Sequence, residues 1–290
     1  MTKLIFKLLR FSGLPFLLRE FIQKKHITII MFHDIGKYQA NKSFKVLSGL
    51  YNIIDLNAFI QAVEKKNKTK LPPYSLIITF DDGHILNYDL LSVFRSYNIH
   101  PTIFLCAGII NTNRHFWFRY KQSAIPISNL KKKSNEDRRK LLGRTGFFQD
   151  NNYEFAQALS KDQINGMRSY VNFQSHTIFH PCLTKCNYYE AKEEILKSKL
   201  ILERDYQLNI NALAYPNGDY TNREIVICKS AGYKCAITVD AGYNTINSDL
   251  FRLKRLSVND TTDINELIVK ASGLWGFIKE FFNLRKLIYK

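Results

Sequence analysis

Short apolar runs recur along the chain, and stretches with helical spacing separate them. The runs lie at 28–32, 76–80, 101–105, 171–174, 212–215, 235–238 and 251–253. Their length and their content of β-branched and aromatic residues predict buried strands. Apolar residues three and four positions apart predict helices within 51–66, over 84–97 and over 188–205. Strands that alternate with helices of this length predict an α/β fold with a parallel sheet or barrel.

The pattern loosens between residues 111 and 162. This stretch contains an aromatic cluster at 115–120 and a charge-rich run at 131–140. We interpret it as an insertion within the same domain, because long segments after strand ends often shape active sites. Near its end, Ser160 followed three residues later by Gln163 is typical of a capping box and predicts that a helix begins here.

Both ends of the chain are apolar and basic at once. Within residues 1–25, Lys7 and Arg10 interrupt the apolar run, so it falls short of the roughly 20 apolar residues that span a bilayer. Such a segment is typical of a helix lying on an anionic membrane surface, and a helix packed on the protein's own core is the equal alternative. Residues 267–290 are predicted to form a second basic amphipathic helix, and two such segments favour the membrane surface. The domain between them is expected to cover 26–266.

Composition narrows the choice of partner. A hydrophobic fraction of 46% in 290 residues allows a sizeable core. There are 42 lysines and arginines against 25 acidic residues, so the formal net charge is +17 and suits an anionic membrane, nucleic acid or acidic glycan. We expect no nucleic acid, because no recognisable nucleic-acid-binding module is present. The five cysteines form no CxxC pair, which indicates reduced thiols.

Two adjacent carboxylates, Asp81 and Asp82, follow the apolar run at 76–80, and Gly83 comes next. Side chains of a regular strand alternate between its two faces, but a glycine lets the chain turn sharply. We therefore predict that both carboxylates point into one site at the end of a strand.

His176 and His180 are four residues apart and follow the run at 171–174. Imidazoles are the commonest metal ligands, and two of them with one carboxylate leave open positions for water and substrate. Asp82 can complete such a triad, which leaves Asp81 as the general base. Histidines with purely structural roles are the alternative for this spacing taken alone.

The order of these motifs resembles that of the NodB-type polysaccharide deacetylases, carbohydrate esterase family four. Residues 79–83 match the TFDDG motif of the family, and residues 176–180 match its H-S/T-x-x-H motif. Residues 214–218 are similar to the Tyr-Pro-x-Gly form of its third motif. The likeness covers roughly residues 27–258.

The resemblance implies a deformed (β/α) barrel of the NodB-homology type, with catalytic groups at the C-terminal ends of the strands. It also implies that Asp81 is the catalytic base and that Asp82, His176 and His180 bind a divalent metal ion, Zn²⁺ or else Ni²⁺ or Co²⁺. The backbone N–H of Tyr215 would help to hold the oxyanion.

The chain departs from the common family pattern at two points. Residues 252–258 lack the histidine with which the family protonates the leaving amine. A subgroup resembling the bacterial poly-N-acetylglucosamine deacetylases has rearranged motifs, with a His-Asp pair near the start, and His33-Asp34 fits that pattern. We therefore expect His33 to be the general acid. The third-motif arginine that orients the base is also missing, and Arg255 is our candidate to replace it.

These expectations combine into a hydrolase that removes N-acetyl groups from an amino sugar of a surface polysaccharide or a lipid-linked glycan precursor. The terminal segments favour a cytoplasmic protein that lies peripherally on the inner face of the membrane. Two alternatives stay open: a deformylase of a polyprenyl-linked amino sugar, and a catalytically inactive carbohydrate-binding homologue.

Overall fold

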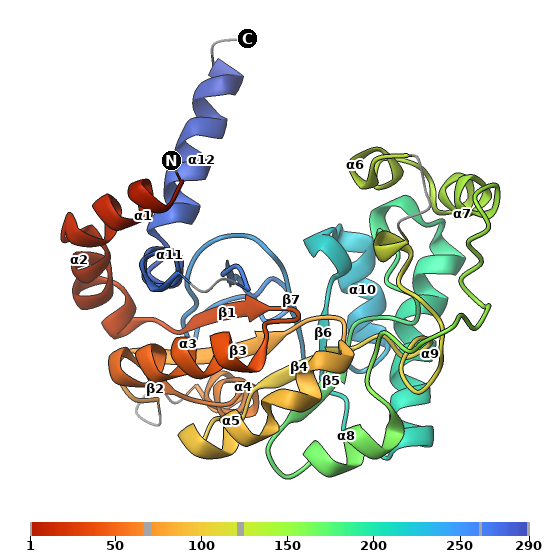
Figure 1. Ribbon diagram of the computed structural model, residues 1–290, viewed down its shortest axis with the longest axis horizontal. Coiled ribbons are helices and arrows are strands. Elements are labelled where there is room, and N and C mark those ends of the chain that lie inside the picture. Colours follow the sequence, from red (N-terminus) through yellow and green to blue (C-terminus); the bar gives the residue numbers. More distant parts are fainter. Residues whose placement is uncertain (1, 67–70, 121–124, 261–262, 289–290) are drawn as a thin grey trace. The chain divides into compact units, whose positions relative to one another are not determined.

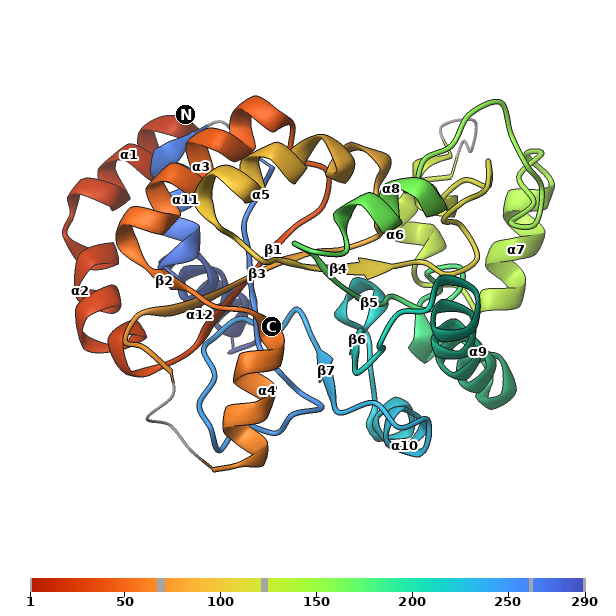
Figure 2. The same cartoon turned by 90° about the horizontal axis from the view of Figure 1, so that it is seen from below.

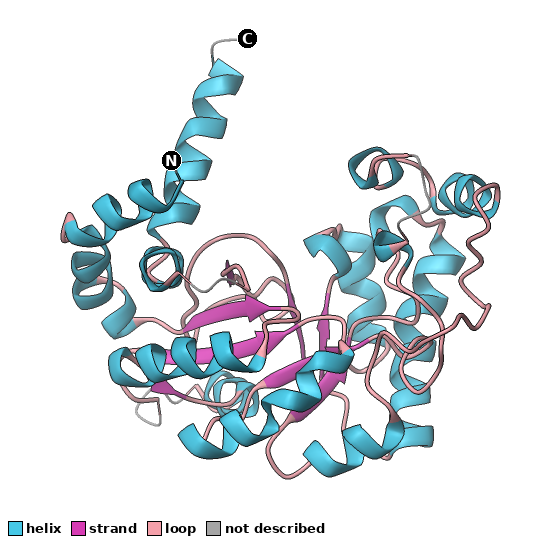
Figure 3. Cartoon of the chain, in the orientation of Figure 1, coloured by secondary structure: helices cyan, strands magenta, loops and turns pink. Residues whose placement is uncertain are grey.

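The computed structural model describes residues 2–66, 71–120, 125–260 and 263–288. The chain divides into two compact units. Unit 1 comprises Met1–Phe80, Asp89–Thr102 and Val239–Lys290, and unit 2 comprises Asp81–Tyr88 and Ile103–Thr238. Each unit contains parallel strands joined by helices and loops, which is the α/β architecture that the sequence predicts (Figures 1 and 3).

In its described part, unit 1 contains the parallel strands β1 (Thr28–Phe32), β2 (Asn52–Ile53), β3 (Ser75–Phe80) and β8 (Leu256–Ser257). β1 lies between β3 and β8, and β2 also pairs with β3. Every residue of β1 and β3 is buried, as expected for continuous apolar runs in a parallel sheet that is covered on both faces.

Four fully buried phenylalanines fix the ends of β1 and β3. Phe32 and Phe80 are the last residues of the two strands and pair in register, with ring centroids 5.5 Å apart. Phe44 from α3 (Lys37–Leu50) and Phe94 from α5 (Leu91–Tyr97) pack against them. These two helices lie side by side (Figure 2). The aromatic cluster therefore holds both strands at the point where polar residues begin.

The ends of the chain fold into unit 1. Its other helices are α1 (Thr2–Phe11), α2 (Leu14–Phe21), η1 (Gln23–Lys25), α4 (Leu56–Glu64), α11 (Ile264–Ala271) and α12 (Leu274–Ile288). Phe6 of α1 is buried against Val269 and Leu274. The C-terminal segment predicted as one helix from residue 267 is two helices, because Gly273 has a φ of 82° and ends the first. Among the described residues, no helix combines the length and apolarity that crossing a bilayer requires.

Unit 2 contains β4 (Thr102–Leu105), β5 (Asn172–Ser175), β6 (Ala212–Ala214) and β7 (Cys235–Ile237), which neighbour one another in this order. Among its helices are α8 (Lys161–Met167), α9 (Tyr188–Tyr206) and α10 (Asn222–Ser230). All three begin with capping boxes. The capping box predicted from Ser160 and Gln163 is confirmed.

The segment interpreted as an insertion has a small core of its own within unit 2. It contains η4 (Trp117–Arg119), α6 (Ile127–Leu130) and α7 (Asn135–Gly143). Trp117, Leu130 and Leu142 are buried together with Phe147 and Cys182. Much of the aromatic cluster noted in the sequence therefore serves packing.

Two sequence-based predictions differ from the structure. Residues 251–253 were expected to form a strand, but Phe251 and Arg252 lie in a turn and only Leu253 forms an isolated bridge. In this turn the Asp249 side chain accepts the N–H of Phe251 at 2.9 Å. This local hydrogen bond competes with strand pairing, and the strand of this region, β8, begins at Leu256. The predicted helix over 84–97 begins as a 3-10 helix, η3 (Ile85–Leu90), before α5.

Candidate functional site

Asp81 and Asp82 follow β3 directly, and both side chains are buried. Asp82 has a φ of 74° and Gly83 a φ of 68°, so the chain turns through the left-handed region. A Cβ atom on Gly83 would lie 2.5 Å from Cδ2 of Leu105, so only glycine fits without displacement. Backbone strain of this kind is often found at functional sites. The turn keeps both carboxylates inside the protein, as the sequence predicts.

His176 follows β5, and neighbouring strands hold both its backbone and its ring. Its N–H donates to the carbonyl of Leu105 at 2.8 Å. Its ring Nδ1 lies 2.8 Å from the carbonyl oxygen of Ala214, at the end of β6. Because a carbonyl only accepts, Nδ1 carries the proton and Nε2 carries the lone pair. A hydrogen bond of this type orients a metal-binding imidazole.

The loop between His176 and His180 is held by Glu194 of α9. Oε2 of Glu194 accepts the backbone N–H groups of Ile178 at 2.8 Å and Phe179 at 3.0 Å. Burial raises the pKa of the Glu194 carboxyl to about 7, although the two N–H donors act in the opposite direction. Glu194 therefore positions the loop that carries both imidazoles.

His180 adopts a left-handed backbone with a φ of 56°, and aromatic rings surround its imidazole. The ring centroids of Phe118 and His176 lie 4.6 and 4.7 Å from that of His180. Nε1 of Trp117 donates to the His180 carbonyl at 2.8 Å. Burial, and then the neighbouring His176, lowers the pKa of His180 well below its usual range. The imidazole is therefore neutral near pH 7, which is the form that binds a metal.

Asp82, His176 and His180 each bring one ligand atom to the same point. Oδ1 of Asp82 lies 3.6 Å from Nε2 of His176 and 3.5 Å from Nε2 of His180. All three ligand atoms lie within 4.8 Å of one another. These separations exceed the roughly 2.7–3.2 Å of N–H···O hydrogen bonds. Ligands about 2.1 Å from a tetrahedral zinc ion would be about 3.4 Å apart, so this set of residues fits a divalent metal ion.

Asp81 lies beside this triad. Its Oδ2 is 3.8 Å from Nε2 of His176, and its side chain is buried. Burying carboxylates is costly unless cations or hydrogen bonds compensate them. A divalent ion held by Asp82, His176 and His180 would provide such compensation and would leave Asp81 as the carboxylate outside the ligand set.

Two expected catalytic residues belong to unit 1. His33 follows β1, its side chain is 39% exposed, and its Nδ1 lies 4.0 Å from the carboxylate of Asp260. Arg255 is fully buried, donates its backbone N–H to the carbonyl of Asp240, and places Nη1 3.4 Å from Oγ1 of Thr79. The catalytic roles expected of His33 and Arg255 stay predictions.

The backbone N–H of Tyr215 has a different partner from the expected oxyanion. It donates to the carbonyl of Ile237 at 3.0 Å, next to the pairing of β6 with β7. The sheet already uses this donor, and the oxyanion role expected of it stays a prediction. This strand end also contributes the carbonyl of Ala214, which orients His176.

Three contributions to the site escaped the sequence analysis: the carbonyl of Ala214, the carboxylate of Glu194 and the ring of Phe118. A backbone carbonyl leaves no pattern in a sequence. Glu194 is one of several acidic residues in a charged helix, and Phe118 is one of several aromatic residues in a cluster. Their roles depend on contacts between segments far apart in the chain.

The family model for polysaccharide deacetylases matches residues 68–236, which is more than half of the chain. This span includes Asp81, Asp82, His176 and His180. The chain therefore belongs to the polysaccharide deacetylase family.

Individual relatives agree with this assignment. The chain is 27% identical over 230 residues to the poly-beta-1,6-N-acetyl-D-glucosamine N-deacetylase of Staphylococcus epidermidis, an alignment that covers 75% of this chain and 65% of that protein. The chain thus spans less than two thirds of that relative's length.

Solved structures show the same fold. IcaB from Ammonifex degensii matches with a TM-score of 0.63 and 16% identity, covering 86% of this chain and 98% of that one. The Streptococcus pyogenes deacetylase PplD matches with a TM-score of 0.61 and 17% identity, with the same coverage. The expected α/β fold of the NodB type, a deformed barrel, is thereby confirmed.

Proposed function

We propose that this protein is a metal-dependent hydrolase that removes acetyl groups from the nitrogen of an amino sugar in a glycan. The observation that carries the proposal is the buried triad of Asp82, His176 and His180, spaced for a divalent ion, with the carboxylate of Asp81 beside it. Family membership and the name of the Staphylococcus epidermidis relative support amide hydrolysis on an amino sugar.

The residues divide the chemistry between them. Zn²⁺, Ni²⁺ or Co²⁺ held by the triad would act as a Lewis acid on the amide carbonyl and would make water a better nucleophile. Asp81 is proposed to take the proton from the attacking water, because it is the carboxylate outside the ligand set. His33 is proposed to protonate the departing amine, and Arg255 is proposed to orient the base.

Replacing Asp81 with asparagine tests this division. Asp81→Asn keeps the size of the side chain but removes the base, so we expect turnover to fall by at least about 10²-fold while the metal content, measured by mass spectrometry, stays that of the wild type. Near-normal turnover would refute the assignment of the base. Loss of the metal in this variant would instead indicate that Asp81 is itself a metal ligand.

The acyl group and the glycan are the finer part of the proposal. Acetyl is favoured by the name of the relative, and a deformylase acting on a polyprenyl-linked amino sugar would use the same residues. Matched N-acetyl and N-formyl glucosamine substrates decide between them. An inactive carbohydrate-binding homologue would bind a glycan but would release neither acetate nor formate.

We also propose that unit 1 binds the surface of an anionic membrane, and that the protein acts peripherally on its cytoplasmic face. The support is the set of exposed apolar side chains on α1 and α2, with the exposed Lys3 and Lys7 among them. Leu8 is 64% exposed, Phe11 70% and Phe21 73%. Apolar side chains next to cationic ones suit the boundary between acyl chains and anionic headgroups.

Deleting residues 1–25 would also remove Phe6 and Gln23, which are buried within unit 1. Point substitutions at exposed positions therefore test this surface better than a deletion does. We expect the Leu8→Ser/Phe11→Ser variant to lose flotation with vesicles that contain an anionic phospholipid. The matched control is Val226→Ser on α10, whose side chain is 64% exposed. Equal flotation of both variants and the wild type would refute the proposal.

A further inference from the structure

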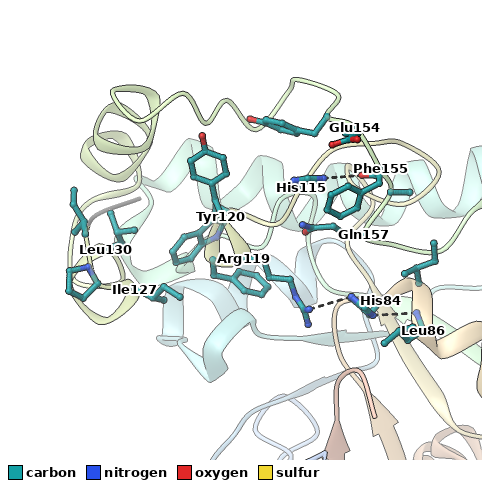
Figure 4. A pocket seen from close by; sticks show the side chains of 17 residues that line it. His84, Leu86, His115, Arg119, Tyr120, Ile127, Leu130, Glu154, Phe155 and Gln157 are labelled. Atoms are coloured by element: carbon teal, nitrogen blue, oxygen red, sulfur yellow. Dashed lines mark hydrogen bonds between the residues drawn. The ribbon is translucent and has the colours of Figure 1, made fainter. Parts of the chain in front are cut away.

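Unit 2 contains a large cavity, and Figure 4 shows the side chains that line it. Its volume is about 1080 Å³, at or above the upper end of the roughly 300–1,000 Å³ typical of ligand pockets. Most of the side chains that line it are apolar or aromatic, among them Leu86, Phe118, Ile125, Ile127, Leu130 and Phe155. Many belong to the insertion at 111–162.

The cavity begins at the edge of the candidate metal site. His84, which lines it, follows the Asp81-Asp82-Gly83 turn directly. The ring of Phe118 lines the cavity and also packs 4.6 Å from the imidazole of His180. A substrate held at the triad could therefore extend a further part of itself into this space.

The polar groups around the cavity are largely used by the protein itself. His115 Nε2 lies 2.9 Å from the carbonyl of Phe155, as Figure 4 shows. The hydroxyl of Tyr120 donates to the Thr145 carbonyl at 2.8 Å. Other engaged groups are the Gln157 side chain, which accepts the N–H of Phe116, and the Tyr153 hydroxyl, which donates to the Phe148 carbonyl.

The aromatic rings of the cavity are likewise engaged with one another. The ring of Tyr153 stacks with those of His115, at 4.6 Å, and Phe147, at 5.9 Å. A glycan site presents hydrogen-bonding groups to sugar hydroxyls and leaves ring faces open for stacking. Apart from the charged side chains of Glu154 and Arg119, the engaged polar groups and rings leave a lining that is mainly hydrocarbon, which favours an apolar occupant.

A permanent positive charge lies where the cavity approaches the catalytic carboxylates. Nη1 of Arg119 is 3.3 Å from Nε2 of His84, the residue after the turn (Figure 4). Guanidinium groups are well suited to phosphate oxygens. From the metal site outward, the protein thus offers the triad, then a guanidinium, then an apolar lining. A ligand that matches this order has a sugar, then a phosphate, then a hydrocarbon chain.

We infer that this cavity binds the hydrocarbon chain of a lipid-linked amino sugar, with Arg119 beside the phosphate that joins sugar to lipid. The inference rests on the proposed function, because it names the substrate class of the same site. Ile127 is 44% exposed and Phe155 57% exposed. A bound chain would cover both side chains and would gain the free energy of burying their apolar surface.

The test compares two substrates and two variants. The substrates are a water-soluble N-acetylglucosamine oligomer and N-acetylglucosamine linked through a diphosphate to a farnesyl chain. In Ile127→Asp/Phe155→Asp, we expect the ratio of kcat/KM for the lipid-linked over the soluble substrate to fall by about tenfold or more, through KM. The matched control, Val226→Asp, should keep the wild-type ratio. An unchanged ratio in the double variant would overturn the inference.

A binding experiment separates this inference from the proposed function. Dodecyl phosphate below its micelle concentration should bind the wild type and Val226→Asp in isothermal titration calorimetry, and inorganic phosphate should not. Binding to Ile127→Asp/Phe155→Asp should be at least about tenfold weaker. Absence of binding to the wild type, or equal binding to all three proteins, would refute the cavity assignment. Binding by a wild type without hydrolase activity would refute the proposed function alone.

Discussion

A histidine–carboxylate pair of unit 2 and one of unit 1, each with its histidine just after a parallel strand, differ in burial. In unit 2, the side chains of His176 and Asp82 are 1% and 3% exposed, with Nε2 and Oδ1 3.6 Å apart. In unit 1, the side chains of His33 and Asp260 are 39% and 25% exposed, with Nδ1 and Oδ2 4.0 Å apart. The residue types are the same, but their access to water is not.

This difference suggests why one pair suits a metal and the other suits proton transfer. A buried imidazole with an oriented ring offers a fixed lone pair, as a metal ligand must. An imidazole that water can reach is also open to a group of the substrate, as a general acid must be. Environment, and not residue type, therefore separates the two proposed roles.

The largest expected effect comes from breaking the buried pair. His176→Ala should abolish stoichiometric binding of Zn²⁺ and lower turnover by at least about 10³-fold. His100→Ala, at an exposed histidine of unit 1, is the matched control and should keep both. Metal analysis after gel filtration checks the first quantity, and acetate release checks the second. A His176→Ala protein that retains its metal would refute the ligand assignment.

Breaking the exposed pair should separate catalysis from metal binding. His33→Gln should lower kcat by about 10²–10⁴-fold, because the leaving amine loses its proton donor, and should leave the metal content unchanged. The measurement is kcat with the N-acetylglucosamine oligomer together with metal analysis of the same sample. Full activity in this variant would remove His33 from the mechanism, and loss of the metal would erase the contrast between the two pairs.

Glu194 tests whether the buried pair needs its supporting loop. Glu194→Ala removes the acceptor of two backbone N–H groups, and we expect the affinity for Zn²⁺ to fall by about 10–100-fold. Glu194→Gln keeps one acceptor oxygen and should recover part of the loss. Competition with a chromogenic chelator measures both affinities without relying on turnover. Equal affinity in all three proteins would show that the loop is held without this carboxylate.

The smallest effect is expected at the partner of His33. Asp260→Asn should change kcat by less than about fivefold, as partly exposed pairs contribute little. It should also change how stability depends on pH. Burial raises the pKa of Asp260 above its ordinary value, and the His33 contacts only partly oppose this.

The sign of this pH effect follows from the raised pKa. The protonated carboxyl stabilises the fold below the unfolded-state pKa of about 3.9, and this contribution is lost as pH rises through the higher folded-state pKa. Asparagine does not ionise, so Asp260→Asn should gain stability relative to the wild type between about pH 4 and neutrality. Urea unfolding of the wild type and the variant, at about pH 4 and near neutrality, measures the difference in their free energies of unfolding. A relative loss over this range would contradict the raised pKa.

The sequence predicted the parts of this molecule that depend on local patterns. Continuous apolar runs located β1 and β3, the mixed stretch at 171–174 located β5, and the acidic turn after β3 located the carboxylates. The misplaced strand at 251–253 shows the limit, because the hydrogen bond that the Asp249 side chain accepts from the N–H of Phe251 favours a turn there. The backbone N–H of Tyr215 shows another limit. Its hydrogen-bond partner, the carbonyl of Ile237, belongs to a different strand, and the local sequence does not reveal this pairing.

The two tryptophans give each unit its own spectroscopic probe. Trp117 lies in unit 2 and donates to the carbonyl of His180, so its emission reports on the loop that carries the imidazoles. Trp275 lies in unit 1, with its ring 4.9 Å from that of Phe6, and reports on the packing of the two chain ends. With Trp275 replaced by phenylalanine, fluorescence should follow the proposed metal loading. With Trp117 replaced, it should follow the proposed contact with vesicles. The chain contains no third tryptophan, so the two signals can be recorded without an added label.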